Sequence, residues 1–87
     1  MKSSTNRRFW DAYYQLPAAV RTEARKTYRL WLHNPRLPIL HFKKVGRVWS
    51  IRIGGTGYRA LADLRGDTVY WFWIGPHDEY ERIIAGR

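Results

Sequence analysis

A histidine and a tyrosine follow the most apolar stretch of the chain, where they could take part in proton transfer. His77 comes directly after Gly75 and Pro76, and Tyr80 lies three residues further on. Histidine exchanges protons near neutral pH, and a tyrosine can orient a reacting group or stack on a base. If a helix begins at His77, both rings lie on one face of it. An ordinary helix start, with Tyr80 packed beneath it, fits the same spacing.

Two arginines upstream could bind a phosphate. Residues 48–53 alternate in polarity. Ser50 and Arg52 should therefore point away from the face on which Ile51 and Ile53 are buried. Arg59 should lie beside Arg52 if the next strand begins directly after the glycine-rich turn. Two guanidiniums on one surface repel each other, but their planar forks of donors match phosphate oxygens. Arginines are common on solvated strand faces. The pair alone therefore does not decide between a phosphate-binding site and an ordinary solvent-exposed surface.

The chain is strongly basic, which favours a partner rich in phosphate. Sixteen Lys and Arg face seven Asp and Glu, for a formal net charge of +9. Lys43 and Lys44, in the first expected strand, could follow an RNA backbone together with Ser50. A basic surface that only confers solubility, or one that matches an acidic partner protein, is the alternative.

No other pattern of catalytic or metal-binding residues competes with this one. The chain has no cysteine, and its three histidines lack the spacing of a metal site, so we expect neither metal nor cofactor. His33 and His41 are typical of a helix end and the start of a strand. The glycines of residues 54–57 lack the lysine of a P-loop and fit a hairpin turn. With no signal peptide or membrane span, a cytoplasmic protein is expected.

The elements that must position these residues form a helical half followed by a strand half, and we expect one domain over residues 1–87. Polar side chains at residues 3–6 offer N-caps to a short helix, and a second helix runs from residue 17 to about residue 32. Disorder is expected only in the first four or five residues. The apolar faces of the two helices contain Phe9, Trp10, Tyr13, Val20, Ala24, Tyr28 and Trp31.

Period-two patterning begins after an extended linker at residues 36–38. Short connections between the runs require antiparallel neighbours, and the last run is apolar on both faces, so it should be central or covered on both sides. A final helix should run from about residue 77 to residue 84. We therefore predict an α+β fold with two N-terminal helices packed on an antiparallel sheet of three to four strands and a short C-terminal helix. The expected strands are residues 41–45, 48–53, 58–64 and 68–74.

Six segments, taken in order, carry a resemblance that covers nearly the whole chain. They are QLPAAV at 15–20, FKKV at 42–45, SIRIG at 50–54, GYRAL at 57–61, GDTVYWFWIG at 66–75 and HDEYERII at 77–84. As a set they resemble short members of the RelE/ParE toxin superfamily of bacterial toxin–antitoxin systems. The resemblance implies helices on an antiparallel sheet, an antitoxin partner, and in many members an endonuclease that cuts mRNA in the ribosomal A site.

The resemblance also implies roles for individual residues. Arg52 and Arg59 match two basic strand positions of the RelE branch, and His77 stands where that branch has an arginine. A C-terminal histidine and tyrosine serve in HigB-like and YoeB-like toxins, which gives His77 and Tyr80 a precedent. The chain departs from the RelE pattern in having Ser50 in place of a lysine, and in lacking a clear strand before the first helix.

The function expected from these observations is a metal-independent, ribosome-dependent mRNA endonuclease that inhibits translation. Its partners would be a cognate antitoxin and mRNA on the ribosome, with no membrane and no small-molecule cofactor. A non-enzymatic DNA gyrase inhibitor of the ParE type and an inactive RNA-binding module remain as alternatives. The expected catalytic residues are Arg52, Arg59, His77 and Tyr80, and the expected RNA-binding residues are Lys43, Lys44 and Ser50.

Overall fold

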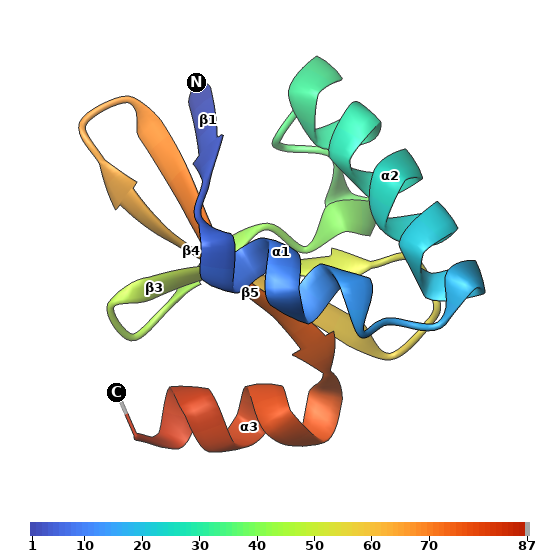
Figure 1. Ribbon diagram of the computed structural model, residues 1–87. Coiled ribbons are helices and arrows are strands. Elements are labelled where there is room, and N and C mark those ends of the chain that lie inside the picture. The colour runs from blue at the N-terminus through green and yellow to red at the C-terminus, as the bar shows by residue number, and fades with distance from the viewer. Residues whose placement is uncertain (87) are drawn as a thin grey trace.

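The computed structural model describes residues 1–86 and shows an α+β fold built on one five-stranded sheet (Figure 1). The strand order is β1-β5-β4-β3-β2, with α1 and α2 packed on one face and α3 on the other. None of the helices within these residues is both long and apolar enough to cross a bilayer. The elements are β1 (Lys2–Thr5), α1 (Arg7–Tyr14), α2 (Ala18–His33), the 3-10 helix η1 (Pro38–Leu40), β2 (Lys43–Val45), β3 (Val48–Ile53), β4 (Tyr58–Arg65), β5 (Thr68–Pro76) and α3 (His77–Ala85).

Strand β5 is an interior strand between β1 and β4 and is covered on both faces, which confirms the prediction made from its apolar residues. A bulge interrupts its pairing with β4, because Leu61 pairs with Trp73 whereas Ala62 pairs with Trp71. The extra residue in β5 is Phe72. Trp71 therefore joins the core under α1 and α2, and both Phe72 and Trp73 join the core under α3.

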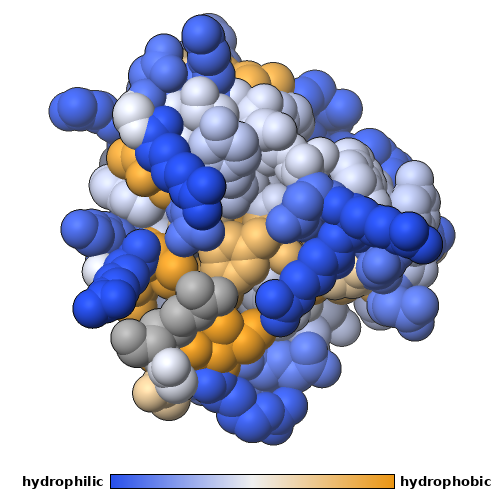
Figure 2. Space-filling view, turned by 60° about the vertical axis from the view of Figure 1, so that its left-hand side comes forward, coloured by the Kyte–Doolittle hydropathy of each residue, from blue (hydrophilic) through white to orange (hydrophobic). Residues whose placement is uncertain are grey.

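The core beneath α3 is the smaller of the two. Its buried members are Val48, Leu61, Phe72, Trp73 and Tyr80, and two partly buried isoleucines near the end of α3 pack against them. Figure 2 looks onto the side where α3 ends and shows a hydrophobic area surrounded by hydrophilic side chains.

Gly75 belongs to this same face and allows a close approach of Trp73. A methyl group at Gly75 would overlap the six-membered ring of the Trp73 indole. The indole therefore lies directly against the backbone of β5, next to the point where the chain turns into α3.

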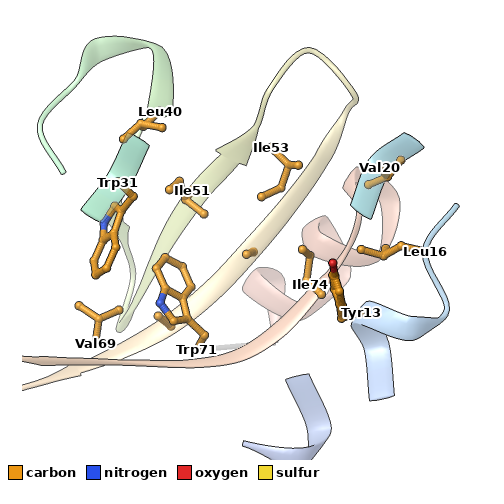
Figure 3. Packing of buried hydrophobic residues seen from close by; sticks show 12 residues of the cluster. Tyr13, Leu16, Val20, Trp31, Leu40, Ile51, Ile53, Val69, Trp71 and Ile74 are labelled. Atoms are coloured by element: carbon orange, nitrogen blue, oxygen red, sulfur yellow. The ribbon is translucent and has the colours of Figure 1, made fainter. Parts of the chain in front are cut away.

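The core beneath α1 and α2 is larger and combines aliphatic side chains with the aromatic rings of Tyr13, Trp31 and Trp71 (Figure 3). Trp31 of α2 is 1% exposed and meets Trp71 edge to face, with 5.3 Å between ring centroids. Helix α1 begins where the polar cap was predicted, because Oδ1 of Asn6 accepts a hydrogen bond from the N–H of Phe9 at 2.9 Å. Strong apolar periodicity in both helices thus produces the main stabilising layer.

The prediction of three to four strands is wrong, because the residues expected to be disordered form β1. This strand runs parallel to β5, with Lys2 opposite Thr68 and Thr5 opposite Trp71. The hydroxyl of Ser3 accepts hydrogen bonds from Nε1 of Trp71 at 3.1 Å and from the Tyr28 hydroxyl at 3.0 Å. A short polar edge strand whose partner lies at the other end of the sequence leaves no local apolar pattern.

Three smaller expectations also differ from the structure. The linker expected to be extended contains η1, and β2 begins at Lys43 because His41 turns the chain with a φ of 48°. In α2 the buried face includes Thr27, whereas Tyr28 is 41% exposed. Tyr28 instead uses its hydroxyl to hold β1, a polar role that hydrophobic spacing does not reveal.

Candidate active site

The two predicted arginines lie side by side on the face of the sheet that α3 covers in part. Arg52 of β3 is paired directly with Arg59 of β4, which confirms the predicted register, and Arg59 is paired with Gly75 of β5. Both side chains are half-buried. The arginine pair, meaning Arg52 and Arg59, therefore occupies one row across the sheet just before β5 leads into α3.

No carboxylate neutralises the arginine pair within residues 1–86. The ion pairs of this part of the chain join Lys26 to Glu23 and His77 to Glu81. The Arg59 guanidinium carbon lies 5.9 Å from the centroid of the Tyr80 ring, and Nη1 donates to its own strand at 3.4 Å. Like charges directly opposite each other on a sheet are destabilising. The pairing of Arg52 with Arg59 therefore does not stabilise the fold, and binding of an anion explains it better.

The Tyr80 ring connects the arginine pair to His77. This phenol is 6% exposed, lies beneath the Arg59 guanidinium, and has its centroid 5.5 Å from that of His77. The backbone N–H of His77 donates to the Gly57 carbonyl at 3.1 Å. This hydrogen bond fixes the start of α3 against the turn before Arg59. The His77 side chain is 46% exposed. The structure thus brings an accessible imidazole and two guanidiniums to one surface, whereas burial excludes Tyr80 from stacking on a base.

The three residues expected to bind RNA do not form one surface, because they differ in the face of the sheet they occupy and in exposure. Lys43 is paired with Ser50 and shares a face with Arg52, whereas Lys44 is paired with Trp49 and points to the other face. Both lysines are exposed. Ser50 is only 2% exposed, so its hydroxyl cannot contact a nucleic acid strand in this conformation. Only Lys43 of these three residues lies where it can extend the charge of the arginine pair.

His41 joins the row although the sequence pattern suggested only the start of a strand. Its Nε2 lies 3.5 Å from Nη1 of Arg52. Register was the signal that could have revealed it: Lys43 opposes Ser50, so continuing by two residues places His41 opposite Arg52. The arginine pair is therefore flanked by His41 on one side and His77 on the other.

A groove lies on the opposite face of the sheet. It has a volume of about 710 Å³ and lies between α1, β1 and α2, with Ile51 and Trp71 among its floor residues. Its walls carry aromatic side chains of α1 and the three arginines of α2 at positions 21, 25 and 29. The groove is thus apolar inside and basic at one wall.

Comparison with known proteins finds similarity in structure only. No protein-family model and no curated protein matches the chain. A solved structure of a mutant of the E. coli toxin RelE in the free state matches with a TM-score of 0.68 and 17% identity, over 98% of this chain and 90% of that one.

Two archaeal complexes match in the same way. The RelB–RelE antitoxin–toxin complex of Methanococcus jannaschii has a TM-score of 0.72 at 15% identity, over 92% of this chain and 96% of that one. The RelE–RelB complex of Pyrococcus horikoshii has a TM-score of 0.62 at 15% identity, over 87% and 93%. The chain therefore has the fold of the RelE toxins.

Proposed function

We propose that this protein is the toxin of a toxin–antitoxin system and cleaves mRNA on the ribosome. The observation that carries the proposal is the un-neutralised arginine pair beside the exposed imidazole of His77. The RelE-like fold supports the same conclusion, since several solved neighbours are toxins or toxin–antitoxin complexes. A phosphate-binding pair next to a proton-transfer group is what cleavage of an RNA strand requires.

The proposed reaction is attack of an RNA 2′-hydroxyl on its own 3′ phosphate. Arg52 and Arg59 hold the phosphate and neutralise the charge that develops on its oxygens, while His77 transfers a proton. Tyr80 is a positioning residue, because its buried ring touches both Arg59 and His77. Positioned proton transfer contributes about 10²- to 10⁴-fold, and one donor to a developing oxyanion about 10²- to 10³-fold.

The proposed protein partner is an antitoxin with an acidic, amphipathic segment. The groove between α1 and α2 offers such a segment apolar contacts, and Arg21, Arg25 and Arg29 on its wall offer complementary charge. Replacing Arg21 and Arg29 together by Glu should weaken antitoxin binding by at least tenfold in a titration with the product of the adjacent gene. Unchanged affinity would contradict this use of the groove.

The function is tested by inducing the wild-type protein and mapping the 5′ ends of transcripts. We expect new ends within coding regions, and about 10²-fold fewer of them for His77→Ala. His33→Ala, at the end of α2, is the matched control and should behave like wild type. Circular dichroism should show that both variants are folded.

Other results would point to the alternative functions. Intact messages with an SOS response would indicate a gyrase inhibitor of the ParE type. Salt-sensitive RNA binding without growth arrest would indicate an RNA-binding module. Either result would contradict the nuclease.

A further inference from the structure

We propose that His41 is the second catalytic residue of this site and removes the proton from the attacking 2′-hydroxyl, while His77 protonates the leaving oxygen. This inference rests on the proposed ribonuclease function. Cleavage by this route needs two proton transfers, one to a base and one from an acid, and His77 alone supplies only one of them.

His41 lies at one end of the row that contains the arginine pair, and His77 lies two residues beyond Gly75, the residue of β5 at the other end. His41 contacts Arg52 on β3, Arg52 is paired with Arg59 on β4, and His77 follows β5, the next strand. Neighbouring strands are about 4.8 Å apart, so the backbones that carry the two histidines are roughly 14 Å apart. A phosphate bound by the arginine pair would lie between the two histidines, with His41 on its attacking side and His77 on its leaving side.

The hydrogen-bond partners of the two rings give them opposite roles. A guanidinium has donors only, so Nε2 of His41, 3.5 Å from Nη1 of Arg52, must face it as an acceptor. An ionised carboxylate has acceptors only, so Nε2 of His77, 3.3 Å from Oε1 of Glu81, must face it as a donor. His41 thus presents a lone pair and His77 presents a proton.

The backbone at His41 is also specialised. His41 is the one non-glycine residue within residues 1–86 that has a positive φ, at 48°. Its N–H donates to the Pro38 carbonyl at 3.1 Å, so η1 holds it in this conformation. Left-handed conformations are uncommon outside glycine and are concentrated at functional sites. This turn places the imidazole beside Arg52 before the chain continues into β2.

The proposed step balances in atoms and charge. The 2′-hydroxyl proton passes to Nε2 of His41 as the 2′ oxygen bonds to phosphorus. The bond between phosphorus and the 5′ oxygen breaks, and that oxygen takes the proton from Nε2 of His77. Arg52 moves from His41 to the phosphate oxygens when RNA binds. The products are a 2′,3′-cyclic phosphate and a 5′-hydroxyl, and water returns the proton from His41 to His77.

The test measures kcat and KM on ribosomes programmed with a short synthetic mRNA. His41→Asn keeps a residue that tolerates the left-handed backbone, and His41→Gln places an amide oxygen near the position of Nε2. Neither side chain can take up a proton. We expect both variants to lower kcat by about 10²- to 10⁴-fold with KM nearly unchanged, while His33→Asn behaves like wild type.

A second substrate, with sulfur in place of the 5′ oxygen at the cleavage site, separates the two histidines. A thiolate leaves without being protonated, so this substrate should restore most of the activity of His77→Ala and none of that of His41→Asn. If this substrate instead restored the activity of His41→Asn and not that of His77→Ala, the assignment of His41 as base and His77 as acid would be overturned. Full activity of His41→Asn and His41→Gln on the ordinary substrate would overturn the role of His41 and leave the proposed nuclease intact. A wild-type protein that does not cleave would instead contradict the function itself.

Discussion

The two faces of the sheet contrast in what their side chains contact. Beneath α1 and α2, rings pack on rings: Trp31 contacts Trp71 and Phe42 at centroid distances of 5.3 and 5.7 Å. Beneath α3, the apolar core is small and gives way to two opposed guanidiniums, with an imidazole at each end. The face beneath α1 and α2 buries apolar side chains. The face beneath α3 keeps Arg52 and Arg59 next to each other although their like charges repel.

This difference shows how a protein of 87 residues can carry a strained site. A small domain has little stability to spare, so one face must supply most of it. The other face is then free to hold the arginine pair in place. Variants on the two faces should therefore change different observables.

The core beneath α1 and α2 should be the most sensitive part of the molecule. Trp71→Ala removes a buried ring that contacts α2 and β1 and should lower the free energy of unfolding by about 3–5 kcal/mol. Urea denaturation followed by tryptophan fluorescence measures the loss. Tyr14→Ala, at a 67% exposed position of α1, is the control and should change stability by less than about 0.5 kcal/mol. Equal losses for the two variants would contradict the assigned core.

The arginine pair should affect activity without supporting the fold. Arg59→Ala should reduce mRNA cleavage by about 10²- to 10³-fold, because a donor to the reacting phosphate is lost. Its free energy of unfolding should stay level or rise, since the repulsion from Arg52 is removed. Arg65→Ala, at the far end of the same strand, is the matched control and should leave cleavage unchanged. A marked loss of stability in Arg59→Ala would show that the two faces are not divided in this way.

Gly75 lies on the face covered by α3, opposite Arg59 and against the Trp73 indole. Gly75→Ala should lower stability by about 1–3 kcal/mol, because the added methyl group overlaps the Trp73 indole. Gly55→Ala has no atom within 4 Å of the added methyl group and an ordinary φ, so it should be nearly neutral. Thermal unfolding of the two variants provides the comparison, and equal melting temperatures would contradict the close approach of Trp73.

The smallest effect should separate the two neighbouring lysines of β2. Lys43 shares a face with the arginine pair and Lys44 does not. Lys43→Ala should reduce the log–log slope of RNA affinity against salt by about 0.7, the value for one phosphate contact on a single strand. Lys44→Ala should leave the slope unchanged. Binding of a labelled RNA oligonucleotide at several salt concentrations measures both, and equal slopes for the two variants would contradict the predicted division.

Sequence patterns predicted the parts of the fold that local periodicity determines. Alternation in β3 and a short glycine turn were enough to place Arg52 beside Arg59. The apolar run in β5 was enough to indicate an interior strand covered on both faces, although the bulge that places both Phe72 and Trp73 under α3 was not foreseen. The helix caps and the position of α3 followed from short-range spacing in the same way.

The missed features depend on contacts between distant segments. β1 is polar, and its partner β5 lies more than sixty residues away, so nothing near Ser3 reveals the pairing. Period two predicted the face of Ser50 but could not show that this position is buried. The left-handed turn at His41 depends on η1 and on the register of β2, and histidine at that position carries no local signal of its own.

The order of the strands also affects the synthesis of the chain. β1 leaves the ribosome first, but its partner in the sheet, β5, is among the last segments to be translated. A nascent chain that ends before residue 68 can pair β2, β3 and β4 with one another, but β1 has no partner strand and neither core is complete without β5. Such a chain also lacks His77. Translation that stops early therefore yields fragments without the complete proposed site, which forms only after β5 and the start of α3 have been made.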